Sequence, residues 1–122
     1  MPKENIVKAK SFQFAVRIVN LYKYLVEVKK EYVMSKQLLR SGTSIGANIR
    51  EGDNAQSKLD FIHKFSVAQK ECDETLYWLE LLKETEYLNE NEFNSIYNEG
   101  EEILKIIKTI LINAKKSKPA SK

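Results

Sequence analysis

The densest group of potential metal ligands in the sequence is a carboxylate cluster, Glu71, Asp73 and Glu74, in a segment with helical periodicity. Di-iron proteins built on helical bundles bind their metals with two Glu-x-x-His pairs and two further carboxylates. This chain has a single histidine, His63, with an aspartate three residues before it. Because only half of one ligand pair is present, the sequence predicts no metal site. We expect Glu71 or Glu74 to pair instead with a basic side chain such as Arg40.

A nucleophilic site needs a nucleophile, a base and a group that orients the base. His63 has one nearby hydroxyl, that of Ser66, and the sequence places no third residue to orient it. We therefore expect His63 to lie on a helix surface. Cys72, the only cysteine, falls on a predicted apolar stripe and is expected to be a small buried side chain without a disulfide partner. No catalytic residue, cofactor or small-molecule substrate is predicted, so the chain is not expected to be an enzyme.

Three of the four glycines lie in the stretch LLRSGTSIGANIREG, at positions Gly42, Gly46 and Gly52. A phosphate-binding loop would show G-x-x-x-x-G-K-[ST] or G-x-G-x-x-G after a strand, and the stretch has neither pattern. The glycines instead share one helical stripe with leucines and isoleucines. A glycine inside a helix costs about 1 kcal/mol relative to alanine, so this spacing favours a helix that a neighbouring backbone approaches closely. Gly52 is predicted to end that helix.

Four segments repeat apolar residues every three or four positions, which is the period of an α-helix. They run over about 8–30, from a cap at Ser35 to 52, from a cap at Ser57 to about 86, and from a turn at 89–91 to about 114. Prolines occur only at positions 2 and 119, and no segment alternates β-branched residues as a strand would. The short connections predict an all-α, antiparallel up-down four-helix bundle over residues 1–116, followed by a mobile basic tail at 117–122.

The first predicted helix carries more apolar surface than a single contact needs. One line of residues shares a single helical face: Phe12, Ala15, Ile18, Val19, Tyr22, Leu25 and Val26. A second line widens the apolar arc: Phe14, Leu21, Tyr24 and Val28. In the third helix, Trp78 lies off the core stripe with Tyr77 and Leu81. Surplus apolar surface indicates contacts between subunits or with another protein, while aromatic residues beside lysines would also suit stacking on nucleic-acid bases.

The charge of the chain is unevenly distributed, although the net charge is only +3. Residues 1–50 carry ten basic and three acidic side chains. Residues 51–104 carry four basic and fourteen acidic side chains, and residues 105–122 carry six basic side chains and no acidic one. This asymmetry suits a polyanionic partner or the pairing of basic and acidic surfaces between subunits; solvated helix faces of unlike sign are a third explanation. An up-down bundle would gather one set of lysines into a nucleic-acid-binding end: Lys3, Lys8, Lys10, Lys115, Lys116 and Lys118.

With 122 residues, the chain has the length of one domain with a core of its own. No apolar run approaches the roughly 20 residues of a membrane-spanning helix, and the N-terminal residues lack the apolar region of a signal peptide. With a single cysteine in addition, a cytoplasmic protein without membrane contact is expected.

The stretch LLRSGTSIGANIREG, followed by SKLDFIHKFSVAQKECDETLYWLELL, resembles the four-helix-bundle proteins first noticed in intervening sequences of bacterial 23S ribosomal RNA genes. The resemblance extends from Phe12 to Ile112 and implies a bundle that assembles into a closed ring, a homopentamer. The family is also similar to the accessory protein of diversity-generating retroelements, a barrel-shaped pentamer that binds a reverse transcriptase and nucleic acid through basic surface. Ten residues match the family signature and are expected to serve packing and interhelical hydrogen bonds: Arg40, Ser41, Gly42, Ser44, Gly46, Asn48, Glu51, Glu71, Glu74 and Trp78.

Two functions are compatible with these features. The first is a non-enzymatic ring that binds RNA, DNA or a protein acting on them through its basic end. The alternative is a structural or protein-interaction module with no nucleic-acid role, in which Trp78 and the second apolar line of the first helix contact a different protein.

Overall fold

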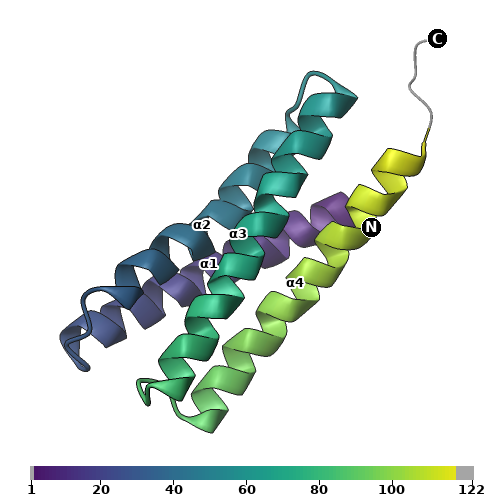
Figure 1. Cartoon of the computed structure of the whole chain (residues 1–122). Helices are drawn as coiled ribbons and strands as arrows, with labels where there is room; N and C mark the ends of the chain where they lie inside the picture. Colours follow the sequence, from purple (N-terminus) through teal and green to yellow (C-terminus); the bar gives the residue numbers. More distant parts are fainter. Residues whose placement is uncertain (1, 118–122) are drawn as a thin grey trace.

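The computed structural model describes residues 2–117, which form four α-helices and, within that range, no strand. The helices are α1 (Lys3–Glu27), α2 (Met34–Asp53), α3 (Lys58–Glu84) and α4 (Glu90–Lys116). Consecutive helices run antiparallel and pack beside one another, and α4 also contacts α1 (Figure 1). The connections are short because each spans only residues 28–33, 54–57 or 85–89. The predicted all-α four-helix fold is therefore confirmed.

One apolar core runs through the bundle and receives side chains from all four helices. In α3 the helical period predicts a stripe of seven residues, of which Phe61 is half-buried and six are buried: Phe65, Ala68, Cys72, Thr75, Leu79 and Leu82. In α4 it predicts a face of ten residues, of which Tyr97, Leu104 and Ala114 are half-buried and seven are buried: Phe93, Ile96, Gly100, Ile103, Ile107, Ile110 and Leu111. No helix within residues 2–117 is long and apolar enough to cross a membrane.

The core face of the first helix includes residues of both apolar lines. Phe12 is 54% exposed, whereas Phe14 from the second line is fully buried. The residues of α1 that are buried are Val7, Ser11, Phe14, Ile18 and Leu25. Both apolar lines satisfy helical spacing, so periodicity alone leaves the rotation of the helix undetermined. The rotation is set by α2, whose glycines leave room for Ser11 and Ile18.

The three glycines of α2 lie in a closely packed helix, as predicted. A Cβ atom on Gly46 would lie 3.4 Å from the Ser11 carbonyl oxygen, which is the expected backbone approach. The other two glycines face side chains instead: a Cβ on Gly42 would lie 2.8 Å from Ile18, and one on Gly52 would lie 2.7 Å from Phe65. Gly52 lies in the last turn of α2, which ends at Asp53 with Asn54 as its cap, so the helix stops where Gly52, Asp53 and Asn54 predict it. Gly52 also makes room for the Phe65 ring.

The cap of α3 is the predicted one, whereas α4 begins at Glu90, inside the turn predicted over 89–91. The Ser57 side chain accepts a hydrogen bond from the Asp60 N–H of α3, at 3.0 Å, as predicted. Asn89 and Glu92 form a reciprocal capping box at the start of α4. Each bond satisfies a backbone N–H that has no partner within its helix.

The predicted cap of the second helix is wrong, because the cap is supplied by Glu31. The Glu31 carboxylate accepts from the N–H groups of Val33, Met34 and Ser35 at 3.2, 2.9 and 2.7 Å. Ser35 lies inside the helix and donates its hydroxyl to the Glu31 carbonyl at 2.8 Å. Lys30 adopts a left-handed φ of 57° that turns the chain back toward α2. A glutamate reaching forward from a turn has no simple sequence signature.

The Glu31 carboxylate is held in its charged form although the residue is only 6% exposed. Burial raises its pKa, but the hydrogen bonds from Met34, Ser35 and Val33 together lower it more. The pKa therefore lies below the ordinary value of 4.5. The negative charge also interacts favourably with the positive end of the α2 dipole.

Candidate interaction surfaces

The lysines predicted to form a basic end come from elements that meet at one end of the bundle. The start of α1 and the end of α4 lie beside the start of α3, and Lys3, Phe61 and Ala114 line one shallow cleft there. Lys3, Lys115 and Lys116 are exposed. Lys118 lies outside the described residues, as does the predicted tail except Ser117. Ser117 accepts hydrogen bonds from the Lys58 ammonium through both its carbonyl and its hydroxyl oxygen.

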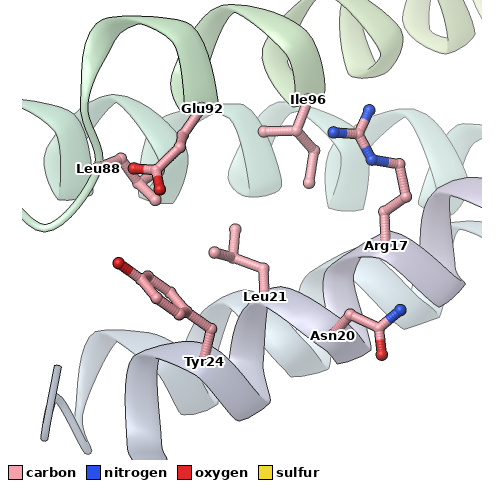
Figure 2. Close-up of a pocket in the computed structure, with 7 residues that line it drawn as sticks. All are labelled: Arg17, Asn20, Leu21, Tyr24, Leu88, Glu92 and Ile96. Atoms are coloured by element: carbon pink, nitrogen blue, oxygen red, sulfur yellow. The ribbon is translucent and has the colours of Figure 1, made fainter. Parts of the chain in front are cut away.

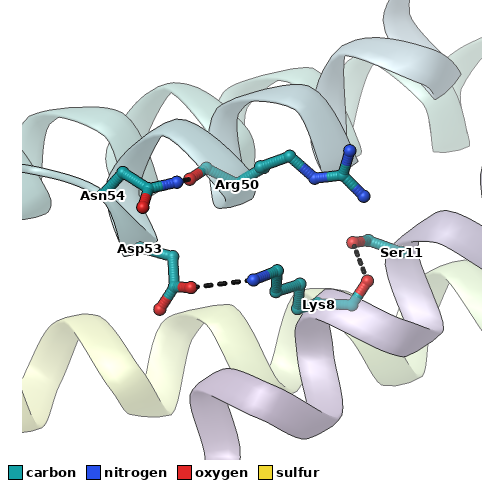
Figure 3. A network of polar contacts seen from close by, with 5 residues as sticks. All are labelled: Lys8, Ser11, Arg50, Asp53 and Asn54. Carbon is teal, nitrogen blue, oxygen red and sulfur yellow. Dashed lines mark hydrogen bonds and ion pairs between the residues drawn. The ribbon is translucent and has the colours of Figure 1, made fainter.

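Two of the predicted lysines are engaged in ion pairs. Lys8 of α1 binds Asp53 of α2 at 2.9 Å, as Figure 3 shows, and Lys10 binds Glu102 of α4 at 3.3 Å. All four side chains keep a third or more of their surface in contact with solvent, so the pairs add little stability. They do reduce the positive charge that is free for a polyanion. Arg50 is exposed beside Lys8 and extends toward Ser11 (Figure 3), a basic residue that the sequence analysis missed.

An apolar groove lies between α1 and α2, close to Arg50. Its volume is about 360 Å³ and its apolar lining includes Phe12, Ala15, Gly46 and Ala47. At Gly46 no side chain fills the groove, so the backbone of α2 forms part of its lining. Phe12 remains 54% exposed at its rim. The surplus apolar surface of the first helix is thus present, with Phe12 of the first line and Val28 of the second line both exposed.

Two of the family signature residues bond across to the neighbouring helix. The hydroxyls of Ser41 in α2 and Thr75 in α3 lie 2.9 Å apart in the buried seam. Glu51 of α2 forms an ion pair with Lys64 of α3 at 2.8 Å. Gly42 and Gly46 serve packing against α1, as expected.

Four of the remaining signature residues make side-chain hydrogen bonds within their own helices: Ser44, Asn48, Glu74 and Trp78. Ser44 donates to the Arg40 carbonyl at 2.6 Å, Asn48 donates to the Ser44 carbonyl at 2.9 Å, and Trp78 donates to the Glu74 carboxylate at 3.1 Å. These four side chains thus bond within their own helices, whereas the expected packing and interhelical bonds are found for Ser41, Gly42, Gly46 and Glu51. Polar side chains near a helix carbonyl reach that carbonyl more easily than a neighbouring helix.

The predicted pairing of Arg40 with Glu71 or Glu74 is absent from residues 2–117. Arg40 is exposed, and Glu74 instead accepts from Trp78. One oxygen of Glu71, Oε1, is buried and has no hydrogen-bond partner there. The helical pattern places these groups on adjacent helices but does not determine where their side chains point.

Two aromatic residues of α3 lie beside acidic side chains. Tyr77 is 56% exposed and packs edge-on against the half-buried Trp78, with ring centroids 5.1 Å apart. Nearby, the Tyr97 hydroxyl of α4 donates to the Glu80 carboxylate at 2.6 Å. This hydrogen bond, with burial and the negative charges of Glu80 and Glu101, raises the pKa of Tyr97 to about 12. Tyr97 is therefore a neutral donor at physiological pH.

The candidate catalytic groups are separate from one another. His63 is exposed on α3, as predicted. Cys72 is buried with its thiol 3.4 Å from the Gly100 carbonyl oxygen. Burial and the charge of Asp73 outweigh Lys108 and raise the pKa of the Cys72 thiol to about 12. The chain from 2 to 117 brings no three His, Cys, Asp or Glu side chains together as metal ligands.

A cleft opens between α1 and α4 at the end of the bundle opposite the start of α1. Its volume is about 340 Å³, and its apolar lining consists of Leu21, Tyr24, Leu88 and Ile96. Figure 2 shows Leu21 and Tyr24 on one wall, with Leu88 and Ile96 facing them. The Arg17 guanidinium at the rim is already bound to Glu99 at 2.7 Å and to the Ser95 hydroxyl at 3.0 Å. The cleft thus offers mainly apolar surface.

Four antiparallel helices around one core, with polar and apolar patches on their outer faces, define this molecule as a helical-bundle protein. The chain belongs to the 23S rRNA-intervening sequence protein family, which matches residues 3–109. A solved structure described as a protein of unknown function from the S23 ribosomal protein family of Bacteroides thetaiotaomicron VPI-5482 is 59% identical. It superposes with a TM-score of 0.90, and the match covers 91% of this chain and 99% of that one. No curated protein matches the chain.

Proposed function

We propose that this protein is a non-enzymatic, oligomeric binding protein of the cytoplasm that holds RNA, DNA or a protein acting on them at its basic end. The observation that carries the proposal is the exposure of Lys3, Lys115 and Lys116 at the end where α1 starts and α4 finishes. None of the three takes part in an ion pair among residues 2–117. Lysines free of acidic partners are the groups that neutralise phosphates.

The proposed assembly is a closed ring, a homopentamer. A ring needs two different complementary surfaces on each subunit. One candidate surface is the groove between α1 and α2, where exposed Phe12 lies with Arg50. The other is the acidic face of α3 and α4, where exposed Tyr77 lies on the helix that carries Glu80. A ring repeats the basic end in each subunit, which raises avidity for a polyanion without any new contact.

The decisive experiment measures binding of fluorescent single-stranded RNA, duplex RNA and duplex DNA at two salt concentrations, with the mass in solution determined alongside. The variant replaces Lys3, Lys115 and Lys116 with glutamate. It leaves Lys8 and Lys10 unchanged, because reversing either would place two carboxylates together. Affinity should fall at least about tenfold in the variant and weaken steeply with salt in the parent protein.

The matched control reverses three lysines at the opposite end of the bundle, Lys29, Lys30 and Lys36, which are also exposed. It makes the same change in net charge, so equal losses in both variants would show that total charge, and not the basic end, governs binding. Absence of binding at low salt by an intact oligomer would refute the nucleic-acid proposal.

The alternative function is a protein-interaction module without a nucleic-acid role, favoured by the exposed Phe12 at the α1–α2 groove. Replacing Phe12 with serine should then remove a protein partner that is captured after nuclease treatment and in high salt. A variant with serine in place of Leu59, which is 80% exposed on α3, is the control for lost apolar surface.

A further inference from the structure

The end of the bundle that carries the α1–α2 connection is basic and apolar. Residues 23–36, the basic lobe, contain four exposed lysines, Lys23, Lys29, Lys30 and Lys36, against one exposed glutamate, Glu27. None of these lysines forms an ion pair within residues 2–117. The same lobe holds three of the large apolar side chains that the protein exposes: Val28 at 63%, Tyr32 at 52% and Val33 at 73%. Such a cluster is typical of a contact surface.

The basic lobe holds these side chains in a defined position. The buried Glu31 carboxylate receives three backbone N–H groups of the connection and of α2. The Glu31 N–H in turn donates to the Leu25 carbonyl of α1 at 2.9 Å. The connection is thereby tied to both helices, so presenting its apolar side chains costs little further conformational entropy.

The α3–α4 connection at the same end has the opposite charge. Residues 80–92, the acidic lobe, contain five glutamates and one lysine. Lys83 pairs with Glu90 at 3.5 Å and lies over the Phe93 ring. Glu84 and Glu86 are exposed and have no ion pair among residues 2–117. Figure 1 shows the two connections as neighbours at one end, and the apolar cleft of Figure 2 lies between their helices.

We propose that two copies of this chain associate end to end through these lobes. A two-fold axis perpendicular to the bundle places the basic lobe of each copy on the acidic lobe of the other, so one kind of contact forms twice. The apolar side chains of the basic lobe then lie against the apolar cleft beside Leu88 and Tyr24 of the second copy. The charge complementarity of the two lobes selects a second copy as the occupant. The contact is separate from the proposed nucleic-acid end, and Glu80 is the residue of the acidic lobe that also lies on the acidic face proposed for the ring.

The test measures mass in solution against protein concentration by sedimentation. The mass of the parent protein should double as its concentration rises, whatever oligomer it forms at low concentration. The dissociation constant of this step should lie between about 1 µM and 1 mM, because the contact is small. Added salt should suppress the doubling, because the exposed charges are screened. A mass that never doubles over this range would overturn the proposal.

A charge exchange makes the test specific. The variant Lys29→Glu with Lys30→Glu makes both lobes acidic, and the variant that combines Glu84→Lys, Glu86→Lys and Glu90→Lys makes both basic. Each alone should lose the doubling, with a dissociation constant at least about tenfold higher. Mixed after separate assembly, the two variants should associate with each other. Doubling by either variant alone, or no association in the mixture, would contradict the lobe-to-lobe contact.

The apolar part of the contact has its own variant, Val28→Ser with Val33→Ser, which should also abolish the doubling. Its control is Leu59→Ser, which removes an exposed side chain near the other end and should leave the doubling intact. Reversing Lys115 and Lys116 should likewise leave it intact. Nucleic-acid binding and end-to-end association can therefore fail independently of each other.

Discussion

The hydroxyl oxygens of Ser41 and Thr75 lie 2.9 Å apart in the buried seam between α2 and α3. Thr75 is fully buried and Ser41 is 1% exposed. Removing one hydroxyl leaves the other without its interhelical partner, whereas removing both leaves two apolar groups in contact.

We therefore expect Ser41→Ala and Thr75→Val each to lower the free energy of unfolding by about 1 kcal/mol. The Thr75 hydroxyl also lies 2.8 Å from the Glu71 carbonyl, which limits the loss. The double variant should be more stable than the sum of the single losses predicts, and urea denaturation of all four proteins measures this coupling. Strict additivity would show that the pair contributes nothing of its own.

Two glycine-to-alanine substitutions should have different effects although both glycines are helical. A Cβ on Gly42 would lie 2.8 Å from two carbons of Ile18, a β-branched side chain with little rotational freedom. A Cβ on Gly100 would lie 2.9 Å from Cδ2 of Leu76, the end of a side chain that can turn away. Gly42→Ala should destabilise the protein by about 1–3 kcal/mol, as overpacking does, and Gly100→Ala by less. Thermal unfolding of the two variants gives the comparison, and an equal effect would contradict the packing argument.

Glu31→Gln tests the charged cap of α2. Glutamine keeps the shape but removes the charge that receives three N–H groups, so we expect a loss of about 1–2 kcal/mol near pH 7. Because the pKa of Glu31 is lowered by folding, its stabilising effect is complete above the ordinary value of 4.5 and disappears as pH falls through the lower value in the folded protein.

The difference in unfolding free energy between the parent protein and Glu31→Gln should accordingly shrink in acid. Urea denaturation over a pH series measures it. Glu84→Gln, at an exposed position, is the control and should differ little from the parent at any pH. A difference that stays constant in acid would argue against a charged Glu31.

Cys72 should be unreactive in the folded protein. Burial raises the pKa of its thiol to about 12, so at neutral or mildly alkaline pH almost no thiolate is present and reagents have no access. Alkylation should proceed only in denaturant or through transient unfolding, and mass spectrometry follows it. Fast labelling of the folded protein at the rate of a free thiol would contradict the buried position.

The two C-terminal helices could be predicted almost completely from the sequence. The α3 stripe from Phe65 to Leu82 has one possible orientation, and Ser57 is a short polar residue at the position where caps occur. In α1, by contrast, Phe12 and Phe14 belong to two apolar lines that satisfy the helical period equally well. The choice between them depends on the contact of Ile18 with Gly42, which is a tertiary interaction that periodicity does not contain.

The candidate surfaces could be predicted only in part. The position of a lysine along a helix follows from the sequence, and the basic end was anticipated in this way. Whether the lysine is free depends on cross-helix neighbours, as the pairing of Lys8 with Asp53 shows. Arg40 is the opposite case, because it is predicted to pair with Glu71 or Glu74 and is exposed instead. The Glu74 carboxylate accepts a hydrogen bond from Trp78.

The side-by-side arrangement of the first turn of α1 and the last turns of α4 has a practical consequence for engineering. A short flexible linker could join these two segments. The new N- and C-termini could then be placed in the α2–α3 connection at residues 54–57. Circular permutants of this kind should fold, because each helix keeps its neighbours. Fluorescent fusions at either original end would also leave the opposite end of the bundle unobstructed.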